Sequence, residues 1–432
     1  MRPGAQIKAA AEVLQDIIER HRPAASALAD WGKAHRFAGS GDRAAIGTLV
    51  FDALRRKSSI AAMMGEDTPR ALALGAAPRA FAMTADEVAA AADGSEHAIE
   101  PLSEEERQRL GAELPEGAPA HVKGDIPDWL FASFERAFGD RAAAEGAALS
   151  ARAPVDLRVN TLKADRERVL KALARHAAEE TPWSPLGVRI PVPHGAGRSP
   201  AVEAETGHGK GWFEVQDEGS QLAAQLAGAG PRQQVLDLCA GAGGKTLAMA
   251  AAMQNTGQIY AYDADKRQLR PIFERLKRAG ARNVQVMDAG EEEALQAMGP
   301  RFDLVLVDAP CTGSGTWRRK PDSKWRLKPA NIPARQAEQA RVLDAGAALV
   351  KPGGRLVYVT CSVLPEENAD QVAAFLARND AFTVEPFGGV WRTQLGSEPP
   401  VSADGREDTL QLTPARHATD GFFIALLRRT SS

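Results

Sequence analysis

Two of the three cysteines in this chain of 432 residues stand directly after apolar runs. Cys311 closes the sequence VDAPC, in which Asp308 precedes it across Pro310, and Cys361 closes VYVTC. A lone buried cysteine usually serves as a small hydrophobic side chain. A deprotonated thiol, in contrast, is a strong nucleophile. Two thiols and a carboxylate at strand ends are therefore candidates for covalent catalysis.

Five apolar runs in the second half of the chain predict the strands that position these residues. They alternate with segments of helix length, which is the pattern of βαβ units in a mostly parallel sheet covered on both faces. Ligands of such doubly wound sheets bind outside the carboxyl ends of the strands. The runs are QVLDL (234–238), QIYAY (258–262), NVQVM (283–287), FDLVLV (302–307) and GRLVYVT (354–360).

A glycine-rich turn follows the first run, in LDLCAGAGGKT (236–246). A strand, such a turn and then a helix allow the backbone to approach a cofactor closely. A P-loop requires glycine six residues before the lysine, where Cys239 stands. A dinucleotide fingerprint that begins at Gly241 requires glycine or alanine where Thr246 stands. The turn therefore favours neither ATP nor a nicotinamide dinucleotide.

Two aspartates follow the next two runs. Asp263 lies twenty residues after Gly243, a spacing that suits a carboxylate accepting hydrogen bonds from ribose hydroxyls. Asp288 ends the third run, where it would meet an adenine amino group. Either aspartate alone is equally typical of a turn or a helix cap. Together they describe a nucleoside pocket without a pyrophosphate site, which suits S-adenosylmethionine.

Methylation of a pyrimidine at C5 is the reaction that requires a thiolate beside S-adenosylmethionine. C5 is a weak nucleophile, and addition of a thiolate to C6 converts the ring into an enamine whose C5 accepts a methyl group. An acid near N3 stabilises the developing charge, and Asp308 suits this role. Lys245 would orient Asp308 or lower a thiol pKa, unless it is an ordinary surface lysine. The residue types alone allow either cysteine to attack.

The order and spacing of these motifs resemble those of the RNA cytosine-5 methyltransferases of the Fmu/Sun (RsmB-like) family, over about residues 155–370. Ala242 stands where that family commonly has proline, and the first 80 residues resemble only weakly the helical, NusB-like RNA-binding extension of its bacterial members. The motifs are LRVNTLK (157–163), GWFEVQDEGSQLAAQL (211–226), LDLCAGAGGKT, AYDAD, VMDAG, VDAPCTGSGTWRRKPD and VYVTCSVLPEEN.

The resemblance implies a role for each candidate residue. It makes Cys361 the nucleophile and gives Cys311 a part in product release, with Asp308 and Lys245 beside them. It implies no metal ion. It also implies that the glycine-rich turn and three aspartates bind S-adenosylmethionine, namely Cys239, Ala240, Gly241, Ala242, Gly243, Gly244, Lys245, Asp263, Asp288 and Asp308.

A basic segment, WRRKPDSKWRLK (317–328), follows VDAPC closely and holds six bases, one acid and two tryptophans. Arginine and lysine neutralise phosphates and tryptophan stacks on an unpaired base, although such runs are often solvated loops. We expect this segment and the α+β unit before the catalytic domain to hold RNA around a flipped or unpaired base. The expected RNA-binding residues are Arg158, Asn160, Arg318, Arg319, Lys320, Lys324 and Trp325.

Length and periodicity predict three parts in an α/β protein. Residues 1–118 form a helical region, with helical periodicity over 7–21 and 42–56 and an acidic linker in which residues 85–118 hold ten acids and two bases. Residues 119–210 form a small α+β RNA-binding subdomain. Residues 211–432 form a Rossmann-like S-adenosylmethionine-dependent methyltransferase domain with a doubly wound, mostly parallel sheet.

The composition indicates the cellular compartment and the partners to expect for the protein. Three cysteines argue against a disulfide framework and for a reducing cytosol. The first residues lack the apolar stretch of a signal peptide, and no apolar run is long enough to cross a membrane. The net charge of −3 includes the acidic segment, so the rest of the chain is mildly basic. We expect a cytoplasmic monomer that binds RNA and no membrane.

The sequence therefore predicts methylation of C5 of a cytosine in RNA, and the resemblance favours the 16S ribosomal RNA of a bacterium. Transfer RNA is the main alternative substrate. A non-catalytic RNA-binding assembly factor with a methyltransferase fold would not need Cys311, Cys361 and Asp308 together. Methylation of an amino group would need no nucleophilic thiol.

Overall fold

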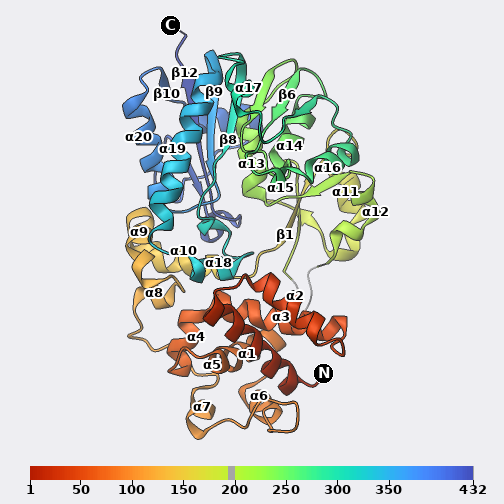
Figure 1. The fold of residues 1–432 in the computed structure, drawn as a ribbon, viewed down its shortest axis with the longest axis vertical. Helices are drawn as coiled ribbons and strands as arrows, with labels where there is room; N and C mark the ends of the chain where they lie inside the picture. Colours follow the sequence, from red (N-terminus) through yellow and green to blue (C-terminus); the bar gives the residue numbers. More distant parts are fainter. Residues whose placement is uncertain (193–199, 432) are drawn as a thin grey trace. The chain divides into compact units, whose positions relative to one another are not determined.

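The structure of the protein, a computed structural model, describes residues 1–192 and 200–431 (Figure 1). Its contacts define two compact units. The first contains Met1–Ala153 and Thr316–Lys328, and the second contains Pro154–Pro191, Pro200–Gly315 and the chain from Pro329 onward. The boundaries predicted at residues 118 and 210 do not coincide with this division. Among the described residues, no helix is both long and apolar enough to cross a lipid bilayer.

The first unit is helical, as predicted for its N-terminal part. α1 begins at Pro3, a favourable first position because proline has no N–H to leave unpaired. Its buried Ile7, Leu14 and Ile17 recur at helical spacing and join the core that α3 and α5 complete. The helices are α1 (Pro3–Arg20), α2 (Ala24–Ala34), α3 (Ser40–Arg55), α4 (Lys57–Met64), α5 (Pro69–Phe81), α6 (Ala85–Ala91), α7 (Glu104–Arg109), α8 (Ala120–Lys123), α9 (Asp128–Phe138), α10 (Ala142–Leu149) and α18 (Pro321–Arg326), with a 3-10 helix at Gly139–Arg141.

The acidic segment 85–118 folds as part of this unit. Its helices α6 and α7 begin with capping boxes, in which Thr84 pairs with Glu87 and Ser103 with Glu106. Val88 is fully buried in the helical core. The segment therefore belongs to the helical region itself, because its caps use part of its acidic charge and its apolar residues are buried.

A small antiparallel sheet opens the second unit, in the order β2-β3-β1-β4. Leu157 and Val159 of β1 alternate with polar residues and pack with Val169 of α11 and Phe213 of β4. The predicted α+β subdomain is present, but its strand β4 lies beyond the boundary predicted at 210. Its elements are β1 (Val155–Val159), α11 (Arg166–Ala172), β2 (Glu179–Glu180), β3 (Gly187–Ile190), α12 (Thr206–Gly209) and β4 (Phe213–Val215), with 3-10 helices at Ala174–His176 and Val202–Ala204.

The catalytic sheet runs in the order β10-β12-β9-β8-β5-β6-β7, with β11 paired to β12. The five predicted strands, β5 to β9, pair in parallel, which confirms the predicted doubly wound fold. The elements are α13 (Glu218–Ala227), β5 (Gln234–Asp237), α14 (Gly244–Ala252), β6 (Gln258–Ala261), α15 (Lys266–Leu269), α16 (Ile272–Ala279), β7 (Val284–Val286), α17 (Glu292–Gln296), β8 (Phe302–Asp308), α19 (Asn331–Leu349), β9 (Val350–Thr360), α20 (Ala369–Arg378), β10 (Phe382–Val384), α21 (Phe387–Leu395), β11 (Leu410–Leu412), α22 (Pro414–His417) and β12 (Phe422–Arg429), with 3-10 helices at Ser314–Thr316 and Pro365–Glu367.

Two apolar cores cover the two faces of this sheet, because successive side chains of a strand point to opposite sides. Leu304 and Leu306 of β8 join a core formed with α13, α14 and α21. Val305 and Val307 join the opposite core, formed with α19 and α20. With both faces buried, the strands read as continuous apolar runs, and this is why they were predictable.

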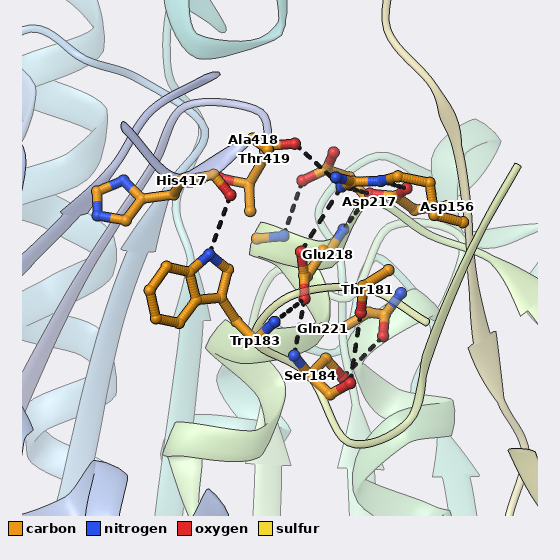
Figure 2. A network of polar contacts seen from close by, with 12 residues as sticks. Asp156, Thr181, Trp183, Ser184, Asp217, Glu218, Gln221, His417, Ala418 and Thr419 are labelled. Carbon is orange, nitrogen blue, oxygen red and sulfur yellow. Dashed lines mark hydrogen bonds and ion pairs between the residues drawn. The ribbon is translucent and has the colours of Figure 1, made fainter. Parts of the chain in front are cut away.

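A buried polar network joins the small sheet to the catalytic domain (Figure 2). Asp156 of β1 accepts hydrogen bonds from Arg189 Nε and Nη2 of β3, at 2.7 and 2.8 Å. Glu218 of α13 accepts from the N–H groups of Trp183 and Ser184, both at 2.7 Å, and burial raises the pKa of Glu218. Buried charged groups need such partners. The network therefore fixes the subdomain against the first helix of the catalytic domain.

The same network continues to a loop of the catalytic domain. Arg189 Nη2 donates to the carbonyl of Ala418 at 3.0 Å. Three residues later, the N–H of Gly421 donates to the carbonyl of Gly315 at 2.8 Å, and the N–H of Gly315 donates to the carbonyl of Cys361 at 3.0 Å. A Cβ at Gly315 would lie 2.1 Å from the carbonyl oxygen of Gly421, so this approach requires glycine. These hydrogen bonds therefore hold the loop after β9 in place.

Candidate active site

The glycine-rich turn connects β5 to α14 at the carboxyl edge of the sheet. Gly241 and Gly243 have φ of 51° and 83°, in the left-handed region. A Cβ at Gly243 would lie 2.5 Å from Cγ1 of Ile272, because α16 packs against the turn there. A Cβ at Gly241 would meet nothing within 4 Å. The turn is therefore closed on its α16 side and open beside Gly241.

Carboxylates surround this turn. Asp263 Oδ2 accepts a hydrogen bond from the N–H of Gly241 at 2.8 Å. Asp237, at the end of β5, accepts from Thr246 Oγ1 at 2.6 Å. Its other oxygen, Oδ1, is buried without a partner among the described residues, and burial raises the pKa of Asp237 to about 7. An unpaired buried oxygen beside an open turn fits a cofactor that carries positive charge, as the ammonium and sulfonium groups of S-adenosylmethionine do.

Lys245 and Asp308 form an ion pair, with Nζ 2.6 Å from Oδ2. The Lys245 side chain is 7% exposed and that of Asp308 is 34% exposed. Lys245 Nζ also lies 5.4 Å from the centre of the Phe422 ring. Lys245 is therefore not a surface lysine. It holds Asp308 from the buried side, and the carboxylate is left open toward a ligand.

The remaining cofactor candidates lie at the margins of the turn. Burial raises the pKa of the Cys239 thiol, and the nearby Asp263 and Asp308 raise it further. Cys239 is therefore a neutral thiol that suits packing beside the turn. Asp288 is exposed after β7, and its N–H donates to Glu291 Oε2 at 2.8 Å. Its predicted contact with adenine stays a prediction.

The two candidate catalytic cysteines meet. Their Sγ atoms lie 3.4 Å apart, on the loops that follow the parallel strands β8 and β9. The hydrogen bond to Cys361 and burial raise the pKa of the Cys311 thiol well above its ordinary value. Cys311 therefore keeps its proton at neutral pH, and in the contact between the two sulfurs either thiol can be the donor. The contact places both sulfurs within reach of one substrate, and the family resemblance implies that Cys361 is the one that attacks.

A single buried carboxylate connects the two cysteine loops. Glu367 is fully buried and accepts from the N–H and the hydroxyl of Thr312, at 2.8 and 2.6 Å, and from the hydroxyl of Ser362 at 2.5 Å. Thr312 follows Cys311 and Ser362 follows Cys361. Because charged acceptors make strong hydrogen bonds in a buried site, Glu367 ties the two loops together and helps to hold the two thiols at their distance.

Arg158 and Asn160, which the sequence suggested as RNA contacts, are buried. Arg158 Nη1 donates to the carbonyl of Gly244 at 2.6 Å and to Gln216 Oε1 at 2.7 Å. Asn160 Nδ2 donates to two carbonyls, those of Gly211 and Ala279, both at 2.8 Å. The structure corrects this expectation, because both side chains are buried and donate to groups inside the protein. Arg158 supports the glycine-rich turn.

A second arginine holds the same turn from α16. Arg275 Nη1 donates to the carbonyl of Ala242 at 2.8 Å. Its Nη2 pairs at 3.0 Å with Glu214 of β4, which also pairs with Arg278. The turn thus has side-chain support at Ala242, where the resembling family commonly has proline.

The basic segment 317–328 is also more buried than expected. Lys324 is fully buried, and its Nζ donates to Ser150 Oγ and the Arg55 carbonyl, both at 2.9 Å; burial lowers its pKa to about 8. Trp325 Nε1 donates to the Leu54 carbonyl at 2.6 Å, and Arg318 is buried. These three side chains serve the packing of the first unit, in place of the expected RNA contacts.

Within the segment, Arg319 and Lys320 are the expected RNA-binding residues that remain exposed. The described residues include no group of histidine, cysteine and acidic side chains that could hold a metal ion.

Three site residues were not identified from the sequence. Asp237 and Thr246 lie inside the quoted turn motif, and Glu367 lies inside VYVTCSVLPEEN. The signal for Glu367 was an acid six residues after a cysteine, which resembles any acid in a surface loop. The role of Glu367 is visible only in the tertiary fold, which brings Thr312 within hydrogen-bonding distance of it.

The fold, the open glycine-rich turn and its carboxylates define the class: an S-adenosylmethionine-dependent methyltransferase with a Rossmann-like domain. The sequence model described as 16S rRNA methyltransferase RsmB/F matches residues 225–428, and that of the RsmF/B-like ferredoxin-like domain matches residues 126–195. The chain belongs to this RsmB/F family.

Curated relatives and solved structures agree. The chain is 34% identical over 308 residues to the probable ribosomal RNA small subunit methyltransferase B of Synechocystis, covering 70% of this chain and 67% of the relative. It is 31% identical over 324 residues to ribosomal RNA small subunit methyltransferase B of Vibrio vulnificus, covering 74% and 71%. The crystal structure of PH0851 is 26% identical and superposes with a TM-score of 0.73 over 99% of both chains. A methyltransferase homologue from Pyrococcus horikoshii is 29% identical with a TM-score of 0.58, covering 72% of this chain and 97% of that chain.

Proposed function

We propose that this protein methylates C5 of a cytosine in 16S ribosomal RNA, through a covalent bond between Cys361 and C6 of the base. The observation that carries the proposal is the pair of thiols with Sγ atoms 3.4 Å apart at the cofactor edge of the sheet. A methyltransferase that acts on an amino group has no use for a nucleophilic thiol. The curated relatives, named as small-subunit ribosomal RNA methyltransferases, support the choice of RNA.

The reaction begins with the Cys361 thiolate, which adds to C6 and makes C5 nucleophilic. S-adenosylmethionine, when bound at the glycine-rich turn, supplies the methyl group that C5 takes. A proton acceptor then removes the C5 proton. The C5–C6 double bond of the cytosine re-forms, and the bond from C6 to sulfur breaks. Cysteine is unchanged at the end, and the base has exchanged one proton for one methyl group.

Asp308 and Lys245 suit the charge that develops on the ring during addition. The partly exposed Asp308 carboxylate can contact the N3 and N4 edge of cytosine, and Lys245 holds that carboxylate at 2.6 Å. A proton that passes from Lys245 through Asp308 to N3 neutralises the charge of the adduct, and the same proton returns to Lys245 as the double bond re-forms. General acid and base catalysis of this kind contributes about 10²–10⁴-fold to a rate.

Cys311 suits the last step. When the bond from C6 to sulfur breaks, Cys361 becomes a thiolate again beside the protonated Cys311. A hydrogen bond from the Cys311 S–H stabilises that leaving thiolate, which accelerates release of the product. Loss of Cys311 should therefore leave the adduct formed but slowly resolved.

The test is a denaturing gel of the protein with 16S ribosomal RNA and S-adenosylmethionine. It compares wild type, Cys311→Ala and Cys361→Ala, and nucleoside mass spectrometry of the same RNA detects 5-methylcytosine. We expect a slowly migrating covalent adduct that accumulates with Cys311→Ala and is absent with Cys361→Ala. Cys239→Ala removes the third thiol, which lies in the cofactor-binding turn, so at saturating S-adenosylmethionine it should accumulate no adduct and still form 5-methylcytosine.

An adduct that forms only with Cys361→Ala would reverse the roles of the two cysteines. Absence of both adduct and 5-methylcytosine, in a wild-type protein that binds the cofactor, would refute the ribosomal RNA assignment, and transfer RNA would be tested next. A methylated amino group would refute the covalent mechanism.

A further inference from the structure

The most basic stretch of the catalytic domain forms its helices α15 and α16. Residues 266–282, KRQLRPIFERLKRAGAR, hold seven lysines and arginines and one acid, Glu274. Arg275 and Arg278 pair with Glu214. Lys266, Arg270 and Lys277 are exposed, and none of the three makes a side-chain hydrogen bond or ion pair to another described residue.

These three cations lie on one face with an exposed aromatic ring. Arg270 and Pro271, between α15 and α16, keep helical backbone angles, so the helical spacing continues through the junction. Lys266, Arg270, Phe273 and Lys277 follow one another at intervals of four, three and four residues, which places them in one row. Phe273 is 59% exposed in the middle of that row. At 1.5 Å per residue the row is about 16 Å long.

The opposite side of the helix fixes this row in place. Leu269 and Ile272 are buried in a small core beside the turn, and Ile272 is the residue that packs against Gly243. The row therefore begins beside the cofactor-binding turn, three residues after Asp263. Figure 1 shows α15 and α16 on the side of the catalytic domain that adjoins the small sheet.

A second cation and aromatic group continues the surface on the small sheet. Arg168 lies 4.1 Å and Lys210 lies 5.2 Å from the centre of the Trp212 ring. Lys163 Nζ donates to the carbonyls of Lys210 and Arg278, at 3.3 and 2.7 Å, and so joins this group to the end of α16. Cations interleaved with aromatic rings are typical of surfaces that bind single-stranded nucleic acid.

We propose that the row Lys266, Arg270, Phe273 and Lys277 binds the substrate RNA, with the cations on phosphates and Phe273 stacked on an unpaired base. This inference rests on the proposed function, because it takes the RNA substrate as given. At the rise of about 3.4 Å per phosphate of a B-form strand, the row is as long as roughly five nucleotides. RNA held there lies beside the turn that binds the cofactor. We thus assign to this row the RNA contacts that the sequence suggested for the buried part of residues 317–328.

The experiment compares two triple variants of the full chain for binding to 16S ribosomal RNA over a series of salt concentrations. The first is Lys266→Ala, Arg270→Ala, Lys277→Ala. The control is Lys351→Ala, Arg378→Ala, Arg392→Ala, which removes the same charge at cations that pair with carboxylates of this chain. Phe273→Leu and Phe273→Tyr are compared separately, because only tyrosine keeps an aromatic ring.

We expect the first triple variant to lower the slope of log affinity against log salt by about two. Its KM for RNA should rise more than tenfold, with an unchanged single-turnover rate at saturating RNA and an unchanged affinity for S-adenosylmethionine. Phe273→Leu should weaken RNA binding about tenfold at every salt concentration, and Phe273→Tyr should restore it.

If the two triple variants have the same salt slope and affinity, the row does not bind RNA, while methylation by the wild type still supports the proposed function. If the wild type itself neither binds nor methylates 16S ribosomal RNA, the proposed function fails and the inference fails with it. The two failures are thus distinguished by the wild-type reaction.

Discussion

Glu367 accepts hydrogen bonds from both the N–H and the hydroxyl of Thr312, at 2.8 and 2.6 Å. Thr312 and Glu367 belong to different strand-end loops, and the same carboxylate also accepts from Ser362. Together with the hydrogen bond from the N–H of Gly315 to the carbonyl of Cys361, this buried carboxylate therefore helps to set the separation of the two thiols, 3.4 Å between Sγ atoms. Glu367 is a positioning residue for the covalent chemistry.

Glu367→Ala should slow methyl transfer by about 10²-fold, because a misplacement of about 1 Å between reacting groups has this effect. Glu367→Gln should retain most of the rate, since its amide oxygen can still accept from Thr312 N–H and the two hydroxyls can turn to accept from its NH2 group. Single-turnover rates at saturating RNA and cofactor measure the difference.

Glu145→Ala is the matched control, because it removes a buried carboxylate from the helical first unit. A purely structural role for Glu367 would lower the folded fraction of both alanine variants and leave the rate per folded molecule unchanged. Recovery of the rate in Glu367→Gln, without a change in the affinity for RNA, would support positioning.

Arg158 offers a second test, because the sequence and the structure give it different roles. Arg158→Met should weaken S-adenosylmethionine binding about tenfold, since the variant loses the charged hydrogen bond to the Gly244 carbonyl. Its RNA affinity should keep the salt dependence of the wild type. Calorimetry with the cofactor and binding of RNA at several salt concentrations measure the two effects.

Lys320→Ala is the comparison for Arg158, because Lys320 is exposed and expected to contact RNA. It should leave cofactor binding unchanged. If the RNA affinity of Arg158→Met depends less on salt while its cofactor affinity is normal, Arg158 contacts RNA after all.

The parts of the fold that were predictable are those whose signal is local. β5 to β9 are buried on both faces, so each is an apolar run, and the carboxyl ends of parallel strands must meet at one edge. That reasoning alone placed Cys311 and Cys361 together. The antiparallel strands β10, β11 and β12 were not predicted, because β10 and β11 are only three residues long and their pairing depends on distant partners.

The sequence could not predict which of the polar side chains are buried. Segments 317–328 and 266–282 are both strongly basic in composition, but Lys324 donates to Ser150 inside the first unit, whereas Lys266, Arg270 and Lys277 stay exposed. A charge run records composition, and only tertiary contacts decide which charges reach solvent. Arg158 failed as a prediction for the same reason.

Asp237 provides a test by pH, because burial raises its pKa to about 7 from an ordinary value near 3.8. Between these two values the folded protein holds a proton that the unfolded chain has lost, so stability falls as pH rises through this window. From pH 5 to pH 8 this one group should remove roughly 2–3 kcal/mol from the free energy of unfolding. Asp237→Asn has no proton to lose and lacks this decrease.

Urea titrations of wild type and Asp237→Asn at both pH values measure the effect. The free energy of unfolding of Asp237→Asn should therefore increase relative to that of the wild type as pH rises. Thr246→Val, which removes the hydroxyl that donates to Asp237 at 2.6 Å, should raise the pKa of Asp237 further and extend the decrease in stability to higher pH. Parallel pH profiles for wild type and Asp237→Asn would show that the carboxyl is ionised throughout, and that the unpaired Oδ1 is reached by solvent instead of waiting for the cofactor.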